Sequence, residues 1–378
     1  MNVLFLLLGC TGSGATDSAD TAIVDGSATI RFAIYNAAMF RDGAGDLAAE
    51  LSGPNSPQGK QIAAVIQTVR PDVLLLQELD NVPGEDALSA FQDNYLEVDQ
   101  GDSAAITYPY AWAAPSNTGV ATDFDLDNND ERTGTGGDAQ GFGLFEGQYA
   151  FAILSMYPFD QDEIRTFQNF LWKDMPDPLL PGGWFSEEEL AIQRLSSKNH
   201  IDVPIETPDG VIHVLGSHPT PPGFDGAEDR NGKRNHDEIR LWADYLSGVD
   251  YLVDDGGVSG GLAEGERFVV MGDLNADPFD GSNIPGTIFQ LLEHPRVNAS
   301  QIPKSDGGAA NDVDPSHQGD NAADTAVWGL RVDYALPSIN LTVADAQVFW
   351  PAPGESGSGL VEGSDHRLVW VDVVIPDE

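Results

Sequence analysis

Apolar, β-branched runs recur along the chain, and several of them end in the same few kinds of polar side chain. The run at 268–278 reads Phe-Val-Val-Met-Gly-Asp-Leu-Asn-Ala-Asp-Pro, which predicts a buried strand followed by a tight polar turn. Asp273 and Asn275 lie two positions apart, so their side chains face the same way if the strand geometry continues. Further runs carry Asn36, Glu78 after Gln77, His218, Asp333, and the pair Asp365 and His366. One such run alone is typical of an ordinary polar turn, but six of them favour a shared polar site.

The spacing of apolar residues between these runs predicts helices and further strands. Helical spacing over 60–70 predicts a helix that Pro71 ends, and an amphipathic pattern predicts another over 235–248. Ser186 is a predicted N-cap of a short helix over 187–195. A hairpin is predicted from 199–204 and 211–217, and other strands at 30–36, 71–78, 148–155, 331–337, 345–350 and 367–375.

The two histidines of the predicted hairpin point to opposite faces of its second strand. His218 shares a face with Ile212 and Val214, whereas His213 lies on the other face. We therefore expect a structural role for His213 and a chemical role for His218.

Taken in chain order, the polar motifs resemble those of the endonuclease/exonuclease/phosphatase superfamily. They read Tyr-Asn36, Gln-Glu78, Ser-His218, Gly-Asp273-Leu-Asn275, Arg-Val-Asp333-Tyr and Ser-Asp365-His366. The resemblance covers about residue 28 to the C-terminus and implies an α/β (α+β) fold, a deoxyribonuclease I-like four-layer sandwich of two mixed β-sheets flanked by helices. Because the motifs are spread over the whole chain, we expect one domain over 29–378 rather than the two that length alone suggests.

The resemblance also implies a divalent metal site for hydrolysis of phosphate esters. Glu78 would be the principal metal ligand, with Asn36 and Asp365 nearby, and oxygen ligands suit Mg²⁺ or Mn²⁺. One departure is the proline-rich 217–222 segment, Ser-His-Pro-Thr-Pro-Pro, where the family more often has an aliphatic residue after the histidine. The class of phosphate-ester substrate is therefore not carried over.

Roles for the remaining motif residues follow from the same resemblance. Asp333 would hold His366 as a base or its electrostatic equivalent, and Asp273 would position the attacking water. Asn275 and His218 would donate hydrogen bonds to the phosphoryl oxygens. The motifs leave open whether Asp273 or His366 removes the proton.

Charge restricts the partners that the chain approaches easily. The 378 residues include 18 basic and 61 acidic side chains, which gives a formal net charge of −43. Such a chain repels nucleic acid at long range, so a nucleic-acid substrate is possible but disfavoured. The densest basic cluster, Arg230, Lys233 and Arg234, either binds a substrate phosphate or pairs with acidic neighbours. We expect a monomer.

An acidic loop lies between 113 and 143. Asp123, Asp125 and Asp127 alternate with other residues, as in a calcium loop. The EF-hand pattern is broken, because Asn128 stands at the turn glycine and Gly134 at the bidentate glutamate. A structural Ca²⁺ and a solvated acidic loop both remain open.

The N-terminal segment predicts export. Cys10 is the single cysteine and follows the apolar run 3–9, which resembles the signal peptide and lipobox of a bacterial lipoprotein. We expect a signal segment over 1–10, a polar tether over 11–28, and a cell-surface or periplasmic protein held by lipid on Cys10. A buried N-terminal strand with an incidental cysteine is the alternative.

Two other functions remain open beside the phosphoesterase. One is a non-catalytic, calcium-binding surface protein that retains the fold, and the other is a dedicated extracellular nuclease. All six motifs are present, which favours an enzyme over the first of these.

Overall fold

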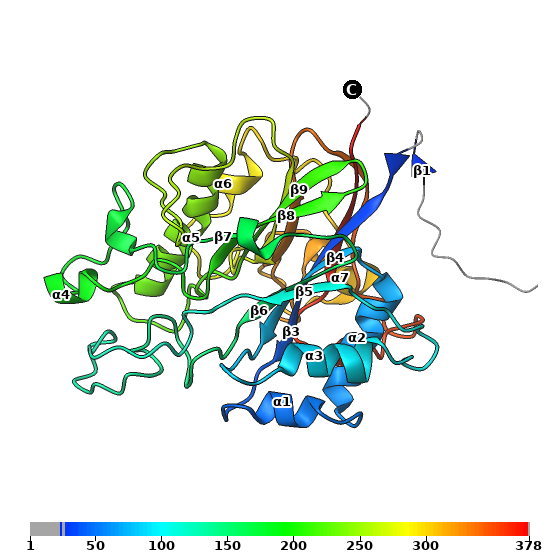
Figure 1. The fold of residues 1–378 in the computed structure, drawn as a ribbon, viewed down its shortest axis with the longest axis horizontal. Coiled ribbons are helices and arrows are strands. Elements are labelled where there is room, and N and C mark those ends of the chain that lie inside the picture. The colour runs from blue at the N-terminus through cyan, green and yellow to red at the C-terminus, as the bar shows by residue number, and fades with distance from the viewer. Residues whose placement is uncertain (1–22, 25–26, 377–378) are drawn as a thin grey trace, which may run out of the picture.

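The fold consists of two mixed β-sheets packed face to face, seen in a computed structural model that describes residues 23–24 and 27–376 (Figure 1). The six-stranded sheet has the order β12 (Thr342–Val348), β13 (Val369–Val374), β3 (Ile30–Met39), β4 (Val73–Leu79), β6 (Phe151–Ser155), β5 (Tyr110–Ala113). The five-stranded sheet has the order β11 (Asp333–Pro337), β10 (Phe268–Asp273), β9 (Gly210–Ser217), β8 (His200–Thr207), β7 (Arg165–Thr166). Each sheet contains one parallel pair, β3 with β4 and β9 with β10, and its other pairs are antiparallel.

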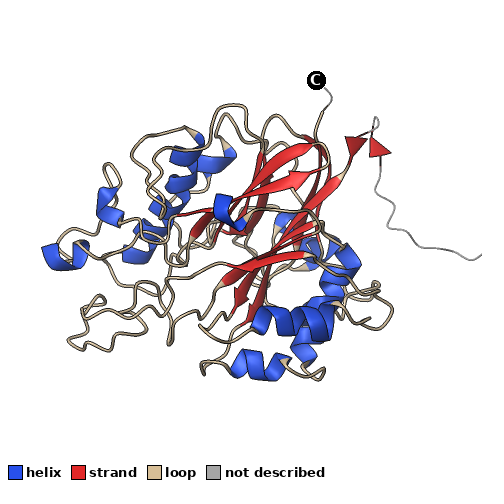
Figure 2. Ribbon diagram, in the orientation of Figure 1, coloured by secondary structure: helices blue, strands red, loops and turns tan. Residues whose placement is uncertain are grey.

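Helices cover the outer faces of the sheets, which completes the predicted four layers (Figure 2). The six-stranded sheet carries α1 (Asp46–Leu51), α2 (Pro57–Val69), α3 (Ala87–Phe91) and the π-helical turn Gln92–Leu96. The five-stranded sheet carries α5 (Arg230–Leu246) and α6 (Phe289–Leu292). The shorter helices are α4 (Glu187–Leu190) and α7 (Asp306–Ala310), with 3-10 turns at Gln161–Glu163, Trp172–Asp174, Asn321–Ala323 and Val361–Gly363.

The fold has three apolar cores, and successive side chains along a strand alternate between the cores on its two faces. Phe32 and Ile34 of β3 face the core between the sheets, whereas Ala33 and Tyr35 face α2. This period of two is the signal that predicted the strands. The third core lies between the five-stranded sheet and α5, where Trp242 is completely buried.

The predicted helices are present, but their bounds shift. α2 begins at Pro57, where the Ser56 hydroxyl accepts the Gly59 N–H. α4 has the predicted Ser186 cap but ends at Leu190. α5 begins at Arg230, five residues before the predicted start, because its polar first turn carries no apolar periodicity and the Asp225 carboxylate accepts the Asn231 N–H.

The predicted signal segment and Cys10 lie outside the described residues. Of the predicted tether, the structure describes a short antiparallel pair, β1 (Ile23–Val24) with β2 (Ser27–Ala28). Among the described helices, none has the length and apolar character needed to cross a bilayer.

Candidate active site

Strand ends from both sheets meet at one place, and a buried glutamine joins them there. Gln77, near the end of β4, donates from Nε2 to the Ser217 carbonyl at 2.8 Å and accepts the Asp273 N–H at 2.8 Å. Gly272 permits the close approach, since a Cβ there would lie 2.1 Å from the Ser217 oxygen. Asp273 and His218 are therefore held in register with Glu78, which follows Gln77.

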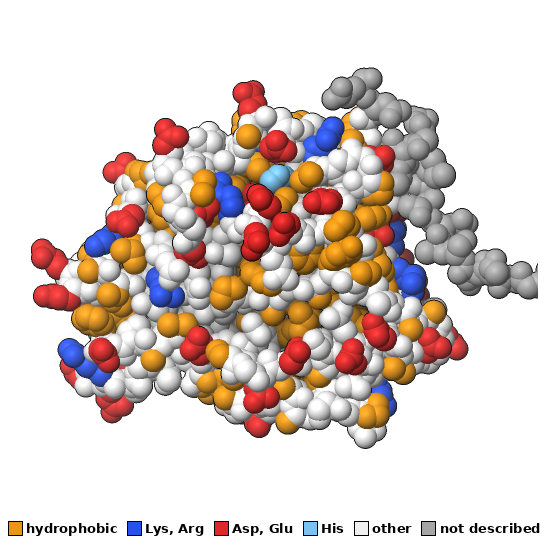
Figure 3. All heavy atoms as spheres, in the orientation of Figure 1, with side chains coloured by type: hydrophobic (Ala, Val, Ile, Leu, Met, Phe, Trp, Pro, Cys, Tyr) orange, Lys and Arg blue, Asp and Glu red, His pale blue; other side chains and the backbone are white. Residues whose placement is uncertain are grey.

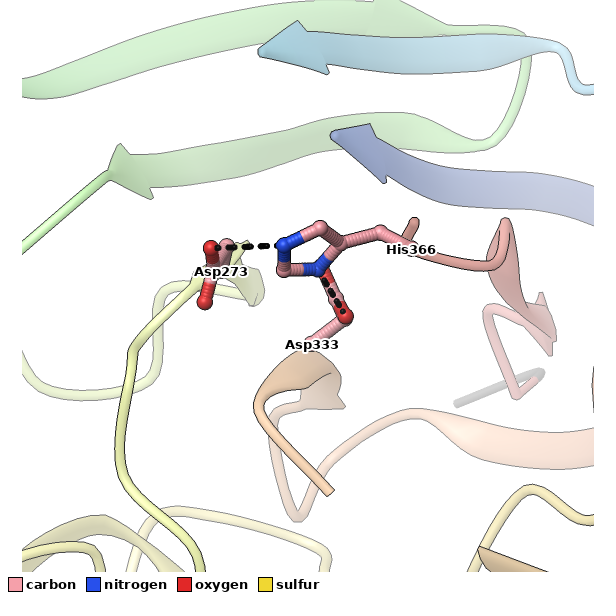
Figure 4. A group of neighbouring side chains, drawn as sticks. All are labelled: Asp273, Asp333 and His366. Carbon is pink, nitrogen blue, oxygen red and sulfur yellow. Dashed lines mark hydrogen bonds and ion pairs between the residues drawn. The ribbon is translucent and has the colours of Figure 1, made fainter. Parts of the chain in front are cut away.

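His366 lies between two carboxylates, one on each ring nitrogen (Figure 4). Its Nδ1 lies 2.9 Å from Asp333 Oδ2, and its Nε2 lies 3.6 Å from Asp273 Oδ2. Asp273 and Asp333 are directly opposite each other in the β10–β11 register, so both side chains point to the same face. All three side chains are buried.

The electrostatics of this triad favour a charged imidazole. Burial alone would lower the pKa of His366, but the Asp333 and Asp273 carboxylates raise it to about 10. Burial opposes ionisation of Asp273 as well, yet His366 and His218 hold the pKa of its carboxyl well below the usual range. At neutral pH the site thus contains an imidazolium beside an ionised Asp273.

Asp273 is also the centre of a wider hydrogen-bond network. Asn36 Nδ2 donates to Asp273 Oδ2 at 3.2 Å and to Glu78 Oε1 at 3.1 Å. The Asn275 N–H donates to Asp273 Oδ1 at 3.0 Å. His218 Nε2 lies 3.4 Å from Asp273 Oδ2 and 4.0 Å from Glu78 Oε1. Together with the triad, the structure thus brings together polar residues from all six runs of the sequence.

Three non-glycine residues of this network and its margin have left-handed backbones. Their φ angles are 49° at Ala38, 56° at Glu78 and 52° at Asn275. Such conformations each cost about 1–3 kcal/mol and persist where the surroundings fix them, often at functional sites. The backbone strain at Glu78 and Asn275 supports a functional role for these two residues.

The donor set around Glu78 fits a hard divalent cation. Its side chain is 19% exposed and lines a cavity of about 560 Å³, with the Asn36 amide 3.1 Å and the His218 ring 4.0 Å from its Oε1. Asp273, Asp333 and His366 also offer ligand atoms within 4.8 Å of one another, but both nitrogens of His366 already face carboxylates. Glu78 is therefore the better placed ligand, and oxygen donors suit Mg²⁺ or Mn²⁺.

The side chains of two predicted site residues make contacts other than the expected ones. Asp365 is exposed, and no hydrogen bond to its carboxylate is found among the described residues. Asn275 Nδ2 donates to the Pro219 carbonyl at 3.2 Å, so its amide also holds the segment after His218. A metal contact for Asp365 and a phosphate contact for Asn275 stay predictions.

His213 bonds Asp202 at 2.6 Å, away from the network, in the structural role expected of it.

The basic cluster is largely engaged with backbone carbonyls. Arg234 donates to the carbonyls of Leu195, Gln140 and Arg194, and Lys233 Nζ donates to that of Glu228. The expected alternative, pairing with acidic side chains, therefore does not describe Arg234. Arg230 lies over the Trp184 ring at 5.2 Å and lines the cavity together with Arg234.

The acidic loop forms a carboxylate cluster, but its residues differ from the predicted set in one position. Carboxylate oxygens of Asp125, Asp127 and Asp138 lie within 4.8 Å of one another, whereas Asp123 is exposed and outside the group. Asp125 accepts the N–H groups of Asn129 and Asp130. A structural Ca²⁺ in this loop stays a prediction.

Sequence reasoning missed three residues that shape the site. Gln77 was visible beside Glu78 but received no role, and Lys198 lines the cavity beside Glu78 and His218. Glu238 of α5 accepts the Ser197 N–H and the Thr220 N–H, each at 2.6 Å, and so fixes the segments that carry Lys198 and His218. Amphipathic spacing put Glu238 on a helix, but gave no signal for its complete burial.

Comparisons with known proteins agree with this geometry. The model of the endonuclease/exonuclease/phosphatase family matches residues 33–366, whereas no curated protein matches the sequence. An endonuclease/exonuclease/phosphatase from Beutenbergia cavernae has a similar structure, with a TM-score of 0.54, 18% identity, and coverage of 92% of this chain and 72% of that one. A family protein from Leptotrichia buccalis has a TM-score of 0.49 and 13% identity, with coverage of 91% of this chain and 99% of that one. Sphingomyelinase C from Streptomyces griseocarneus has a TM-score of 0.47 and 14% identity, with coverage of 91% of this chain and 99% of that one. With a match that spans most of its length, the chain belongs to the endonuclease/exonuclease/phosphatase family of metal-dependent phosphoric ester hydrolases.

Proposed function

We propose that the protein hydrolyses phosphodiester or phosphomonoester bonds by in-line attack of water. The observation that carries the proposal is the placement of His366 between Asp333 and Asp273, with His218 3.4 Å from the same Asp273 oxygen and 4.0 Å from Glu78. This arrangement offers an ionised carboxylate, a fixed cation and a further donor around one point, which are the groups that phosphoryl transfer requires.

Each residue has a role that its environment supports. Asp273 is ionised and accepts hydrogen bonds, so it orients the attacking water and takes its proton. His366, whose pKa is raised to about 10, acts as a positive donor rather than as the base. His218 donates from Nε2 to the phosphoryl oxygens, and burial lowers the pKa of this second histidine, which keeps it neutral.

Glu78, with Asn36 and Asp365 nearby, would hold the divalent cation, which we propose is Mg²⁺ or Mn²⁺. When bound, the cation supplies Lewis-acid neutralisation of the nonbridging phosphate oxygens. Asn36 orients the Glu78 carboxylate through its 3.1 Å hydrogen bond and so fixes the ligand before the cation arrives. The complete polar set supports catalysis over the non-catalytic alternative.

A paired substitution tests this function. Glu78→Gln should abolish hydrolysis of bis(4-nitrophenyl) phosphate and 4-nitrophenyl phosphate, because it removes the anionic ligand at nearly constant volume. Glu293→Gln, an exposed residue at the end of α6, is the matched control and should behave like the unaltered protein. Chelation should stop the reaction, and Mg²⁺ or Mn²⁺ should restore it. Full activity of Glu78→Gln, or of the chelated protein, would refute the assignment.

We further propose that the protein is exported and anchored by lipid on Cys10, and that it acts as a monomer. The support for the anchor is the apolar run that ends at this cysteine, and for the monomer, that one chain carries all the site residues named above. Cys10→Ser should move the protein from the membrane fraction to the soluble fraction. An exported protein whose intact mass still includes Met1 would rule the anchor out.

A further inference from the structure

Lys198 is a buried lysine beside the catalytic network. It is 6% exposed, lies just before β8, and lines the 560 Å³ cavity together with Glu78 and His218. Within residues 23–24 and 27–376, no hydrogen bond or ion pair within 4.0 Å reaches its Nζ. Although the side chain is buried, its Nζ is not among the unpartnered polar atoms that solvent cannot reach, so the ammonium group opens to the cavity, where water or a ligand must be its partner.

The nearby carboxylate that would be its natural partner is engaged elsewhere. Glu238 accepts the Ser197 N–H with one oxygen and the Thr220 N–H with the other, each at 2.6 Å. These bonds hold the segments that carry Lys198 and His218, both of which line the cavity. Burial lowers the pKa of Lys198, whereas the charges of Glu238, Glu78 and Asp273 act to keep it protonated. The ammonium is thus attracted by anions that it does not contact.

The cavity beside Lys198 has an apolar part in addition to the charged side chains of Asp127, Arg230 and Arg234. Phe142, Phe185, Trp172 and Leu126 line it, and its volume lies within the roughly 300–1,000 Å³ typical of small-molecule sites. The loops that carry these residues, drawn from cyan to green, gather at one side of the molecule beyond the strand ends (Figure 1). An organic group of limited size would fill this space, but a polymer would have to leave it.

Charge on the rest of the molecule favours the same kind of ligand. Acidic side chains are scattered over the face shown in Figure 3, with few basic ones among them. The net charge of −43 opposes the approach of a polyanion far more than that of a small monoanion or dianion.

We propose that Lys198 binds a nonbridging oxygen of the substrate phosphate, and that the cavity receives the compact, apolar organic group of a small phosphate ester. This inference rests on the proposed function and names the substrate class. Lys198 then compensates substrate charge beside Glu78 and His218, in addition to the imidazolium of His366.

Lys198→Met separates a binding role from a structural one. The change keeps length and apolar volume but removes the charge, so it should raise the melting temperature, since the lost ammonium had no partner among the described residues. It should weaken binding of inorganic phosphate to the Mg²⁺-loaded protein by about 10- to 100-fold in calorimetry, as expected for a charged hydrogen bond. Lys304→Met is the control, because Lys304 is 53% exposed and pairs with Asp320 at the surface. Phosphate binding as tight in Lys198→Met as in the unaltered protein would overturn the inference.

Ala139→Phe tests the cavity. Ala139 is buried in the cavity wall, and a phenyl ring there would occupy part of the space. The ratio of kcat/KM for phenyl 4-nitrophenyl phosphate to that for methyl 4-nitrophenyl phosphate should fall by about 10-fold, because the phenyl ester loses its apolar contact. Ala309→Phe, on exposed α7, should keep the ratio. An unchanged ratio in Ala139→Phe would refute the cavity assignment.

The two kinds of failure are distinguishable. If the unaltered protein hydrolyses no ester with Mg²⁺ or Mn²⁺, the proposed function fails, yet phosphate calorimetry still decides whether Lys198 binds phosphate. If the protein is active but Lys198→Met binds phosphate normally, the proposed function stands and this inference fails.

Discussion

Gln77 ties the two sheets together at the active site, and its replacement should damage stability and catalysis at the same time. The side chain is completely buried, and its amide makes one hydrogen bond to the Ser217 carbonyl and one to the Asp273 N–H. Gln77→Leu keeps the approximate volume but leaves both backbone groups without a partner. A buried unsatisfied group costs about 1–3 kcal/mol, so the two together should lower the free energy of unfolding by about 2–6 kcal/mol.

The catalytic loss follows from what the amide positions. The Asp273 backbone would lose the contact that fixes its distance from β4, and the Ser217 carbonyl precedes His218 directly. A displacement of about 1 Å at reacting groups costs on the order of 10²-fold in rate. We therefore expect kcat of the folded variant to fall by about 10²-fold, although Gln77 contacts no substrate.

Gln67→Leu provides a matched control. Gln67 is also buried and donates to the carbonyls of Tyr95, Leu96 and Val98, but it lies on α2, outside the active-site network. Urea unfolding should show a comparable destabilisation of both variants, whereas kcat should fall in Gln77→Leu alone. The reasoning would be refuted if folded Gln77→Leu kept its kcat, or if Gln67→Leu lost as much.

The remaining predictions concern the triad, a buried histidine and salt. His366→Ala and Asp333→Asn should each lower kcat by about 10²-fold or more, with the double variant no worse than the poorer single one; multiplicative losses would contradict the pair. Burial lowers the pKa of His200 from 6.5 to about 4. Between these pH values the unfolded chain binds more protons than the folded one, so the free energy of unfolding is highest above pH 6.5 and decreases as the pH falls. Urea unfolding should therefore show a loss of about 2 kcal/mol between pH 8 and pH 5 that His200→Gln lacks, and an equal loss in both proteins would disprove this origin. Initial rates on a small diester should change little with salt, whereas rates on duplex DNA should rise toward moderate salt; a steep fall on DNA would indicate a dedicated nuclease.

Local sequence signals predicted the individual strands and most residues of the network, whereas the four layers followed from the family resemblance. Alternation along β3 and β10 marks strands with one face toward each core, and polar residues where such strands end must lie at a sheet edge. Asn36, Glu78 and Asp273 came together for this reason. The order of strands within each sheet has no such local signal and was not predicted, and the arrangement as two mixed sheets came only through the family resemblance.

Other features depend on contacts between distant segments, which local patterns do not contain. Asp138 joins the acidic cluster from beyond the alternating positions, because the chain turns back at Thr133 and Gly136. Lys198 was overlooked because lysine is almost always exposed, and only the packing of α5 against the segment before β8 buries it. Helical spacing likewise missed the polar first turn of α5, which begins at Arg230.

The triad connects the packing of the sheets to the chemistry of the site. Asp273 and Asp333 are buried and directly opposite each other on antiparallel strands, an arrangement in which two like charges repel. The ring of His366, from the segment that leads into β13 of the other sheet, lies between them. The two carboxylates raise the pKa of His366 to about 10. Gln77 from β4 and Asn36 from β3 reach the same Asp273, so the six-stranded sheet and the segment leading into it contact this aspartate through three side chains. Any change in the separation of the sheets therefore alters both the position of Asp273 and the charge around it.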